Sequence, residues 1–558
     1  MKTDETKVLS PVEQPAPKPR KQRGLWWVVK WSLAVIVPMI VLIVLLNFRM
    51  GPGKGRPLVR ISRQTTYATS PLKPSGDVDY VAYLNQQNAI TPENNAFVEL
   101  LKILGPVTAG QMPPPKFFQL LGIDPMPQGG NYLIKFPYVK KLVGRSILLA
   151  DGTTPDSEQA YEITQTIPFE PGVFLEADQW FETNEQHLNA IHSAVQKPGF
   201  FIPCMGKLMV GVDFSLANGM REIARALQRS SMARLGQGDV AGTIDDQVAM
   251  LQLARHVGRQ GTMVEHLIAL AIEGMAHRSI SQTIFSDKCT AEDLARLAAE
   301  LKAQSRVLPV GPLHLQSERV AVLDAVIHIG RNGPIPWNGN FSNTALGINS
   351  QPPTVGDELL RASIDWETVC VTLNEIFDKL EKALASDGAS RATAIEQFEA
   401  ELKAIEQEFG TPKKKILSAL AGRGSRSTMA GNILATTITP GVRQLSDADR
   451  RSAAQHSLNE VAVALQRFRL EHGKYPMQLD ELVPVFLAEV PLDPFTGGPL
   501  VYKPDKGDPF LLYSRGPNKK DDGGVDMFEA QNNQYDLIAA PIIRTVQQWI
   551  EANVAKRE

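Results

Sequence analysis

Apolar residues recur at helical spacing through most of the stretch between residues 176 and 420. They stand at positions i, i+3, i+4 and i+7, and each run ends near a glycine or a proline. Turns of only a few residues, such as 235–239 and 258–261, would make successive helices antiparallel neighbours. The helices expected from this pattern are 178–196, 214–235, 240–258, 261–285, 291–304, 311–330, 356–385 and 390–409. The sequence therefore predicts a mainly α protein, with residues 176–420 as an α-helical domain.

The arrangement of these helices stays open between two alternatives. About 22 residues separate consecutive helix starts over 217–285, which suits stacked helical pairs in a solenoid of the tetratricopeptide type. No repeated signature of Trp, Leu-Gly and Tyr accompanies that spacing, so a non-repetitive helical bundle fits the sequence equally well.

One segment is apolar enough to cross a membrane. Residues 31–48 carry no charge, and a helix of that length measures roughly 27 Å, which matches a hydrocarbon core. Trp26, Trp27 and Trp31 stand where an aromatic belt is expected. No small-x-small cleavage site follows the segment, which favours an anchor over a cleaved signal peptide. Residues 25–48 are therefore predicted to be a single N-terminal transmembrane helix, a signal anchor.

The flanks of this anchor predict how the chain is placed. Residues 1–24 are rich in Pro, Lys and Glu, cannot bury a core, and are expected to be a disordered cytoplasmic tail. Basic residues are equally frequent on both sides of the span, so charge alone does not orient it. A short tail before one span and a large following part is nevertheless typical of an anchor with a cytoplasmic N-terminus. The basic, Gly- and Pro-rich residues 49–75 are a predicted linker.

Residues 76–175 are expected to form a mixed region. Two short apolar runs between Val78 and Leu104 predict a helical hairpin, with Thr91 and Pro92 opening its second helix. The remainder is rich in Pro and Gly and leaves room for one or two strands.

Composition argues against two classes of protein. The 58 Lys and Arg residues nearly balance 60 Asp and Glu residues, so no overall field would attract nucleic acid. The three cysteines, Cys204, Cys289 and Cys370, lie too far apart in the sequence for a disulfide framework or a spaced thiolate metal site. We expect them to be small apolar residues in helices.

Residues 445–540 have the pattern of a small α+β domain. An amphipathic helix over 445–472 precedes Gly473, which suits a left-handed C-cap. A short second helix is expected over 480–485, followed by the strands PLVYKP and FLLYSR after Pro- and Gly-containing turns. The residues expected to lie between the helix and an antiparallel sheet are Leu458, Val461, Leu465, Phe468 and Leu470. Residues 541–558 are predicted to be a terminal helix.

An ordered series of segments in this domain resembles the globular part of the type II secretion major pseudopilin, the G-type protein. The series is ALQRFRLEHGKYP, LDELVP, VPLDPFTGGPLVY and LLYSRGPNKKDDGG. The rest of the chain resembles no characterised family. The resemblance implies a helix packed on an antiparallel sheet, at the outer side of the inner membrane.

The N-terminal part departs from the pseudopilin pattern. Pseudopilins begin with Gly followed by Phe or Met, an apolar helix and a Glu at its fifth position, which filament packing uses. The single span of this chain lacks that signature and lies about 400 residues before the domain. We therefore expect no processed filament subunit, but a domain reused for folding or docking.

Oxygen donors are dense in the segment after Tyr513. Calcium takes six to eight oxygen ligands from a loop that can fold round it. The corresponding pseudopilin loop binds calcium, so the resemblance implies a Ca²⁺ site here. Asn518, Lys519 and Lys520 depart from the family pattern in ways that weaken such a site, and a solvated Asx-rich turn is the alternative. The metal ligands expected are Asp521, Asp522, Asp526 and Asn518.

Three pairs of side chains have the residue types of a catalytic site, but their spacing and setting do not favour one. His187 and His192 are five residues apart, whereas helical metal-binding histidines are four apart with a glutamate between them. Glu265-His266 and Asp245-Asp246 are more simply charged pairs on helices. The sequence contains no nucleophile elbow and no phosphate-binding loop. No catalytic residue and no cofactor other than calcium is predicted.

These observations predict a non-enzymatic envelope protein of a bacterium, held in the inner membrane by one span, with its bulk in the periplasm. Its expected partners are the membrane and envelope proteins, including components of a secretion or pilus-like assembly, and not nucleic acid. The alternative is a periplasmic hydrolase with an unrecognised active site in the helical domain.

Overall fold

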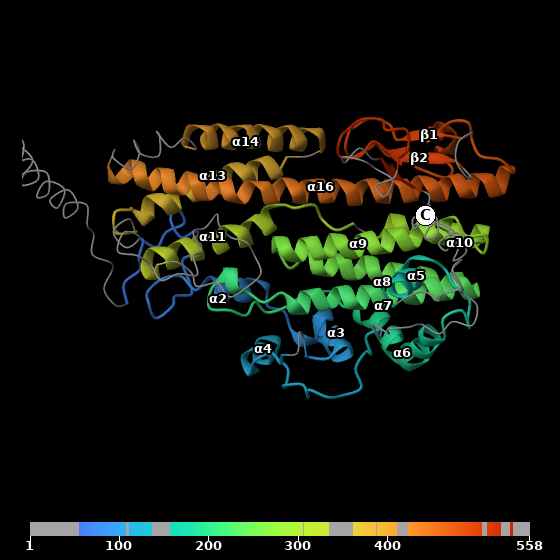
Figure 1. The fold of residues 1–558 in the computed structure, drawn as a ribbon, viewed down its shortest axis with the longest axis horizontal. Coiled ribbons are helices and arrows are strands. Elements are labelled where there is room, and N and C mark those ends of the chain that lie inside the picture. Colours follow the sequence, from blue (N-terminus) through green and yellow to red (C-terminus); the bar gives the residue numbers. More distant parts are fainter. Residues whose placement is uncertain are drawn as a thin grey trace, which may run out of the picture.

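A computed structural model describes residues 55–107, 111–136, 157–304, 306–333, 361–386, 388–409, 422–504, 510–525 and 536–539. These residues form a mainly helical protein with one small antiparallel sheet (Figure 1). Within these ranges no helix is both long and apolar enough to cross a bilayer. The predicted tail 1–24, anchor 25–48 and terminal helix 541–558 lie outside the described residues.

Three long helices that pack on one another form the centre of the molecule: α7 (Ser215–Gln237), α8 (Val240–Gly258) and α9 (Met263–Ile284). Gly238 ends α7 in the left-handed conformation, and the Asp239 side chain then caps α8 by accepting a hydrogen bond from the Gly242 amide. This tight turn makes α7 and α8 neighbours, as their spacing predicted.

The other helices surround this centre. They are α2 (Tyr80–Asn88), α3 (Ala96–Leu104), α4 (Pro115–Leu121), α5 (Ser157–Thr166), α6 (Leu175–Ala194), α10 (Ala291–Ala303), α11 (Pro312–Asn332), α13 (Trp366–Leu384) and α14 (Gly388–Phe409). Short 3-10 turns occur at η1 (Pro92–Asn94) and η2 (Met209–Gly211). The helices predicted between residues 178 and 409 are thus confirmed to within a few residues, except that α13 begins ten residues later than expected.

The helices α2 and α3 do not form the predicted helical hairpin. α2 lies against α11, and α3 lies against α6, so each has its main contact with a different helix. The side chain of Asn95 caps α3 by accepting from the Phe97 amide, whereas Thr91 and Pro92 begin only the 3-10 turn. Beyond α3, the described residues up to 174 form the helices α4 and α5 and no strand.

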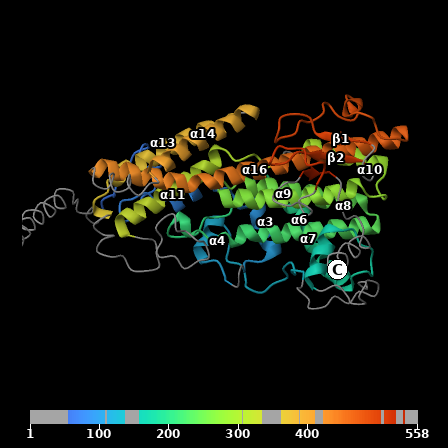
Figure 2. The ribbon, with the colours of Figure 1, turned by 45° about the horizontal axis from the view of Figure 1, so that its top comes forward.

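The longest element is α16 (Arg423–His472), which runs along the molecule in contact with α9, α10, α13 and α14 (Figures 1 and 2). The prediction that this helix begins at residue 445 was wrong by 22 residues. Pro440 removes a backbone donor and costs a helix interior about 3 kcal/mol, which the packing of α16 on its neighbours offsets. A solenoid contacts only adjacent repeats, whereas α16 returns along helices far earlier in the chain.

A three-stranded antiparallel sheet packs on the C-terminal half of α16. Its strands are β1 (Val501–Lys503), β2 (Leu511–Ser514) and β3 (Leu537–Ile538), in the order β1-β2-β3. Tyr502 pairs with Leu512, and Tyr513 pairs with Ile538.

The predicted burial of the α16 stripe is confirmed with one exception. Leu458, Val461, Leu465 and Phe468 are buried, and Leu470, in the last turn of the helix, is exposed. The expected second helix is a single 3-10 turn, η4 (Leu479–Leu482). The buried Leu512 of β2 belongs to the same hydrophobic core as the buried side chains of α7, α8 and α9. We call residues 473–539 together with the last turns of α16 the C-terminal module.

Candidate functional site

Three of the four candidate calcium ligands, Asn518, Asp521 and Asp522, lie in the loop that follows β2, from Arg515 to Val525. Its start is fixed by Asp493, a fully buried residue in the turn before β1. One carboxylate oxygen of Asp493 accepts hydrogen bonds from the Ser514 hydroxyl at 2.8 Å and from the Phe495 amide at 2.9 Å. The other accepts from the Arg515 amide at 3.0 Å. The exit of β2 is therefore held rigidly to the entry of β1.

Asp521 is bound to the sheet itself. Its Oδ1 accepts a hydrogen bond from the Tyr513 hydroxyl at 2.6 Å and another from the Gly523 amide at 3.0 Å. The Tyr513 hydrogen bond is the main reason why the pKa of Asp521 lies below its ordinary value. Burial, followed by the nearby Asp521 charge, raises the pKa of Tyr513. The Lys503 ammonium donates a further hydrogen bond to the Tyr513 hydroxyl oxygen at 2.8 Å, so that Lys503, Tyr513 and Asp521 are linked in a series.

Asp522 and Asn518 are neighbours in the same loop. The Asn518 amide donates to Asp522 Oδ2 at 2.7 Å, and the Asn518 carbonyl oxygen accepts from the Lys520 backbone amide at 2.9 Å. Lys519 between them has a positive φ of 60°, which closes the turn. The structure therefore brings Asn518, Asp521 and Asp522 into one loop, and Asp526 lies outside the described residues.

Asp536, immediately before β3, is a residue that sequence reasoning missed. It is fully buried, and its Oδ2 accepts from the Gly524 amide at 2.7 Å. Its Oδ1 has no hydrogen-bond partner among the described residues. Burial is the main cause of a raised pKa at Asp536, and the charges of Asp522 and Asp521 add to it. No strand was predicted at residues 537–538, so the sequence offered no signal for Asp536, which the pairing of β3 with β2 brings to this loop.

The loop has the oxygen chemistry of a calcium site, with Asp536 as the carboxylate whose free oxygen could turn towards an ion. Cations would relieve the repulsion among these acids. Within the described ranges, however, no three His, Cys, Asp or Glu side chains converge as metal ligands do. Calcium binding therefore stays a prediction of the resemblance.

The pairs that suggested catalysis are separated by the fold. His192 Nε2 lies 2.7 Å from the buried Asp246 carboxylate, while His187 Nε2 lies 3.1 Å from the Asn131 carbonyl. The Glu265 carboxylate accepts from the Thr262 hydroxyl at 2.7 Å at the start of α9. The His192–Asp246 contact joins α6 to α8, whereas Glu265 is held within the first turn of its own helix.

A buried polar seam joins α9 to α16, and we define it by His266, Glu273 and His277 on α9 and Asp449, Ser452 and Asn459 on α16. His266 Nε2 lies 2.7 Å from Asp449 Oδ1, the Ser452 hydroxyl donates to Glu273, and the Asn459 amide donates to the His277 carbonyl at 3.0 Å. Burial keeps the pKa of His277 well below its ordinary value. The members of the seam are buried, so they hold the two helices in register and are not open to a substrate.

All three cysteines are free thiols. Cys370 is buried in α13, whereas Cys204 and Cys289 lie in connections between helices. The prediction that all three cysteines lie in helices is therefore correct only for Cys370. Burial raises the pKa of each to about 12, which makes these thiols poor nucleophiles and poor metal ligands at neutral pH.

Comparison of the chain with protein-family models, with curated proteins and with solved structures finds no match.

Proposed function

We propose that the protein is a non-enzymatic, membrane-anchored component of the bacterial envelope that binds other envelope proteins. Residues 25–48 would hold it in the inner membrane with a cytoplasmic N-terminus, and the folded part would lie in the periplasm. The uncharged segment 31–48 supports the anchor. The resemblance of residues 445–540 to a pseudopilin supports an association with a secretion or pilus-like assembly.

The observation that carries this proposal is an apolar surface on the C-terminal module. In the connection from α16 to β1, Met477 is 65% exposed, Val485 is 71% exposed and Leu492 is 61% exposed. Single exposed apolar residues are common on soluble proteins, and we infer an interaction surface from the occurrence of three large ones on the connection of residues 473–500. We call Leu470, Met477, Val483, Val485 and Leu492 the apolar surface of the module; each is at least 36% exposed.

The border of this surface indicates the charge of its partner. Residues 469–489 of the module expose four acidic residues, against the basic residues Arg469 and Lys474. The exposed acidic residues are Glu471, Asp480, Glu481 and Glu489. Complementary charge at the rim of an interface guides association and rejects wrong partners. The surface therefore suits a protein that presents apolar side chains flanked by Lys or Arg.

The packing of the first half of α16 favours a docking role of the protein over assembly into a filament. In pseudopilins the helix before the globular part packs in the filament. Here the corresponding part of α16 is covered by the chain itself: the Asp365 amide before α13 donates to the Ser427 hydroxyl at 2.7 Å. Further along, Leu445 is buried with Phe398 and Leu402 of α14. A helix face that is already covered is not free to join a filament.

In-cell crosslinking tests the proposal, with capture of the full chain and identification of the bound envelope proteins. We expect Val485→Asp to lose a specific set of partners that the wild type recovers. Leu313→Asp is the matched control, because Leu313 at the start of α11 is 44% exposed and lies outside the module. Identical partners for wild type and Val485→Asp would exclude the apolar surface as a docking site. Recovery of the full chain in the soluble fraction would exclude the anchor.

The alternative of a periplasmic hydrolase gains no support from the described residues. The buried histidine–carboxylate pairs His192–Asp246 and His266–Asp449 each join two packed helices.

A further inference from the structure

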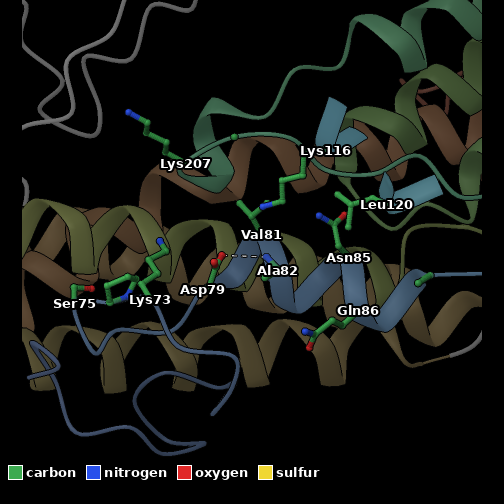
Figure 3. A pocket seen from close by; sticks show the side chains of 13 residues that line it. Lys73, Ser75, Asp79, Val81, Ala82, Asn85, Gln86, Lys116, Leu120 and Lys207 are labelled. Atoms are coloured by element: carbon green, nitrogen blue, oxygen red, sulfur yellow. Dashed lines mark hydrogen bonds between the residues drawn. The ribbon is translucent and has the colours of Figure 1, made fainter. Parts of the chain in front are cut away.

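A cavity of about 510 Å³ opens between α2, α4 and the segment before η2 (Figure 3). Its volume is within the range of small-molecule sites, roughly 300 to 1,000 Å³. The walls come from residues 73–89, 116–120 and 206–207, which lie far apart in the sequence. The apolar lining residues are Pro74, Val81, Ala82, Ala89 and Leu120.

Hydrogen bonds between these segments hold the cavity in shape. The Asn85 side chain of α2 makes two bonds to the backbone of Cys204: its amide donates to the carbonyl at 2.9 Å, and its oxygen accepts from the amide at 2.8 Å. The Lys73 ammonium donates to the buried Asp324 carboxylate at 2.8 Å, which also accepts from the Met209 amide at 2.8 Å. The walls of residues 73–89 and 206–207 are therefore fixed before any ligand arrives, which lowers the cost of binding.

The cavity carries an excess of positive charge. Lys73, Lys116 and Lys207 line it, and Asp79 is the single acidic lining residue. Asp79 Oδ1 already accepts a hydrogen bond from the Ala82 amide as the cap of α2. Lys73 is neutralised by Asp324, but Lys116 and Lys207 make no ion pair within the described ranges. In Figure 3 the Lys116 side chain points towards Val81 and the interior of the cavity.

We propose that this cavity binds a phosphate monoester with a short apolar body. Lys116 points into the cavity, whereas the exposed Lys207 side chain extends away from it in Figure 3 and would turn inward for the two lysines to match the charge of a phosphate monoester, roughly −1.5 to −2 at neutral pH. Lysine binds phosphate as a compact point charge that needs no fixed orientation. The apolar wall of Val81, Ala82 and Leu120 then takes the organic part of the ligand. This site is independent of the apolar surface of the module.

Calorimetric titration of the full chain in nonionic detergent with hexyl phosphate tests the site. We expect saturable binding that weakens about two- to fivefold in Lys116→Gln and in Lys207→Gln, and further in the double variant. Lys102→Gln is the matched control: Lys102 is an exposed lysine on α3 that does not line the cavity, and binding should be unchanged. Ala82→Trp should abolish binding by filling the cavity. Thermal unfolding of each variant shows whether the fold is intact.

Two further ligands separate the head group from the apolar body. Hexanol and inorganic phosphate should each bind much more weakly than hexyl phosphate. Equal affinity of hexanol and hexyl phosphate would overturn the role of the lysines. Equal affinity of the wild type and the double lysine variant for hexyl phosphate would overturn the proposal.

The source of the phosphate ligand is distinguished in nanodiscs. If the cavity takes a lipid head group, phosphatidic acid in the disc should compete with hexyl phosphate and lower its apparent affinity. If the ligand is a soluble phosphate ester, discs with and without phosphatidic acid should give the same affinity. Both results support the phosphate site and assign its ligand.

Discussion

The imidazole Nε2 of His266 on α9 lies 2.7 Å from the carboxylate Oδ1 of Asp449 on α16. The second oxygen of Asp449 accepts a hydrogen bond from the Val310 amide at 2.8 Å. The ring of His266 also lies 4.4 Å from that of His314 on α11. One carboxylate therefore ties together α9, α16 and the segment that leads into α11. Because α16 carries the C-terminal module, this contact also fixes the module on the helical body.

Replacing Asp449 should destabilise the protein strongly. Asp449→Ala leaves the Val310 amide and the His266 imidazole without their partner, and the expected loss is about 3 kcal/mol. Asp447→Ala is the matched control: Asp447 is on the same helix, but its pair with Arg450 at 3.7 Å is partly exposed and worth at most about 0.5 kcal/mol. Urea unfolding monitored by circular dichroism gives both values. Equal losses for the two variants would contradict a central role of Asp449.

Acidification should destabilise the protein through His314. Burial, followed by the charge of His266, lowers the pKa of His314 to about 4. Between pH 6.5 and 4 the imidazole of His314 is protonated in the unfolded state but not in the folded state. The contribution of His314 to the free energy of unfolding is therefore fully present above pH 6.5 and falls as the pH drops towards 4. The loss at pH 5 is about 2 kcal/mol. His314→Asn should reduce the difference between urea midpoints at pH 7.5 and pH 5, whereas the exposed control His472→Asn should keep it.

Glu265 should have the opposite pH dependence. Burial raises its pKa to about 7, so between pH 4.5 and 7 the folded carboxyl holds a proton that the unfolded one has lost. Its contribution to stability is therefore present below pH 4.5 and is lost as the pH rises through 7, by an amount on the order of 3 kcal/mol. Glu265→Gln should be more stable than the wild type at pH 8 in chemical unfolding. The same advantage in Glu292→Gln, an exposed position on α10, would rule out burial as the cause.

Gly236 on α7 should not tolerate a side chain. A Cβ at this position would lie 1.8 Å from the backbone oxygen of Phe169 and 2.3 Å from its carbonyl carbon. Gly236→Ala must move one of the two segments, and we expect a loss of about 3 kcal/mol or more in thermal unfolding. Gly274→Ala on α9 is the control: the nearest atom is 3.7 Å away, and the variant should gain up to about 1 kcal/mol. A neutral Gly236→Ala would mean that Phe169 lies elsewhere.

Calcium binding to the loop after β2 can be measured on the full chain. If the site exists, millimolar calcium should raise the unfolding temperature and give heat in a calorimetric titration. Asp521→Asn and Asp536→Asn should each reduce the affinity at least tenfold, because each removes a carboxylate charge from the ion. Asp480→Asn, on the exposed turn η4, should leave it unchanged. No heat change with millimolar calcium would leave an Asx-rich turn as the correct description of the loop.

The helices between residues 178 and 409 could be predicted because their signals are local. Periodic apolar residues and caps such as Asp239 and Thr262 lie within a few positions of the backbone that they organise. The start of α16 could not be predicted in this way, because Pro440 and the neighbouring threonines indicate a break. Contacts with α13 and α14, which lie elsewhere in the sequence, decide that the helix continues.

The residues of the candidate sites show the same limit. Asn518, Asp521 and Asp522 were identified because they share one short loop. Asp536 was missed because only the pairing of β3 with β2 brings it to Gly524. The Lys116 and Lys207 cavity and the His266–Asp449 pair depend on packing between distant segments, and neither leaves a pattern in the sequence.

The 50 residues of α16 form a rod of about 75 Å, with the β-sheet on one end and α13 and α14 on the other. One continuous element therefore connects the C-terminal module to α13 and α14, and Pro440 is the one position inside it that cannot donate a backbone hydrogen bond to the helix.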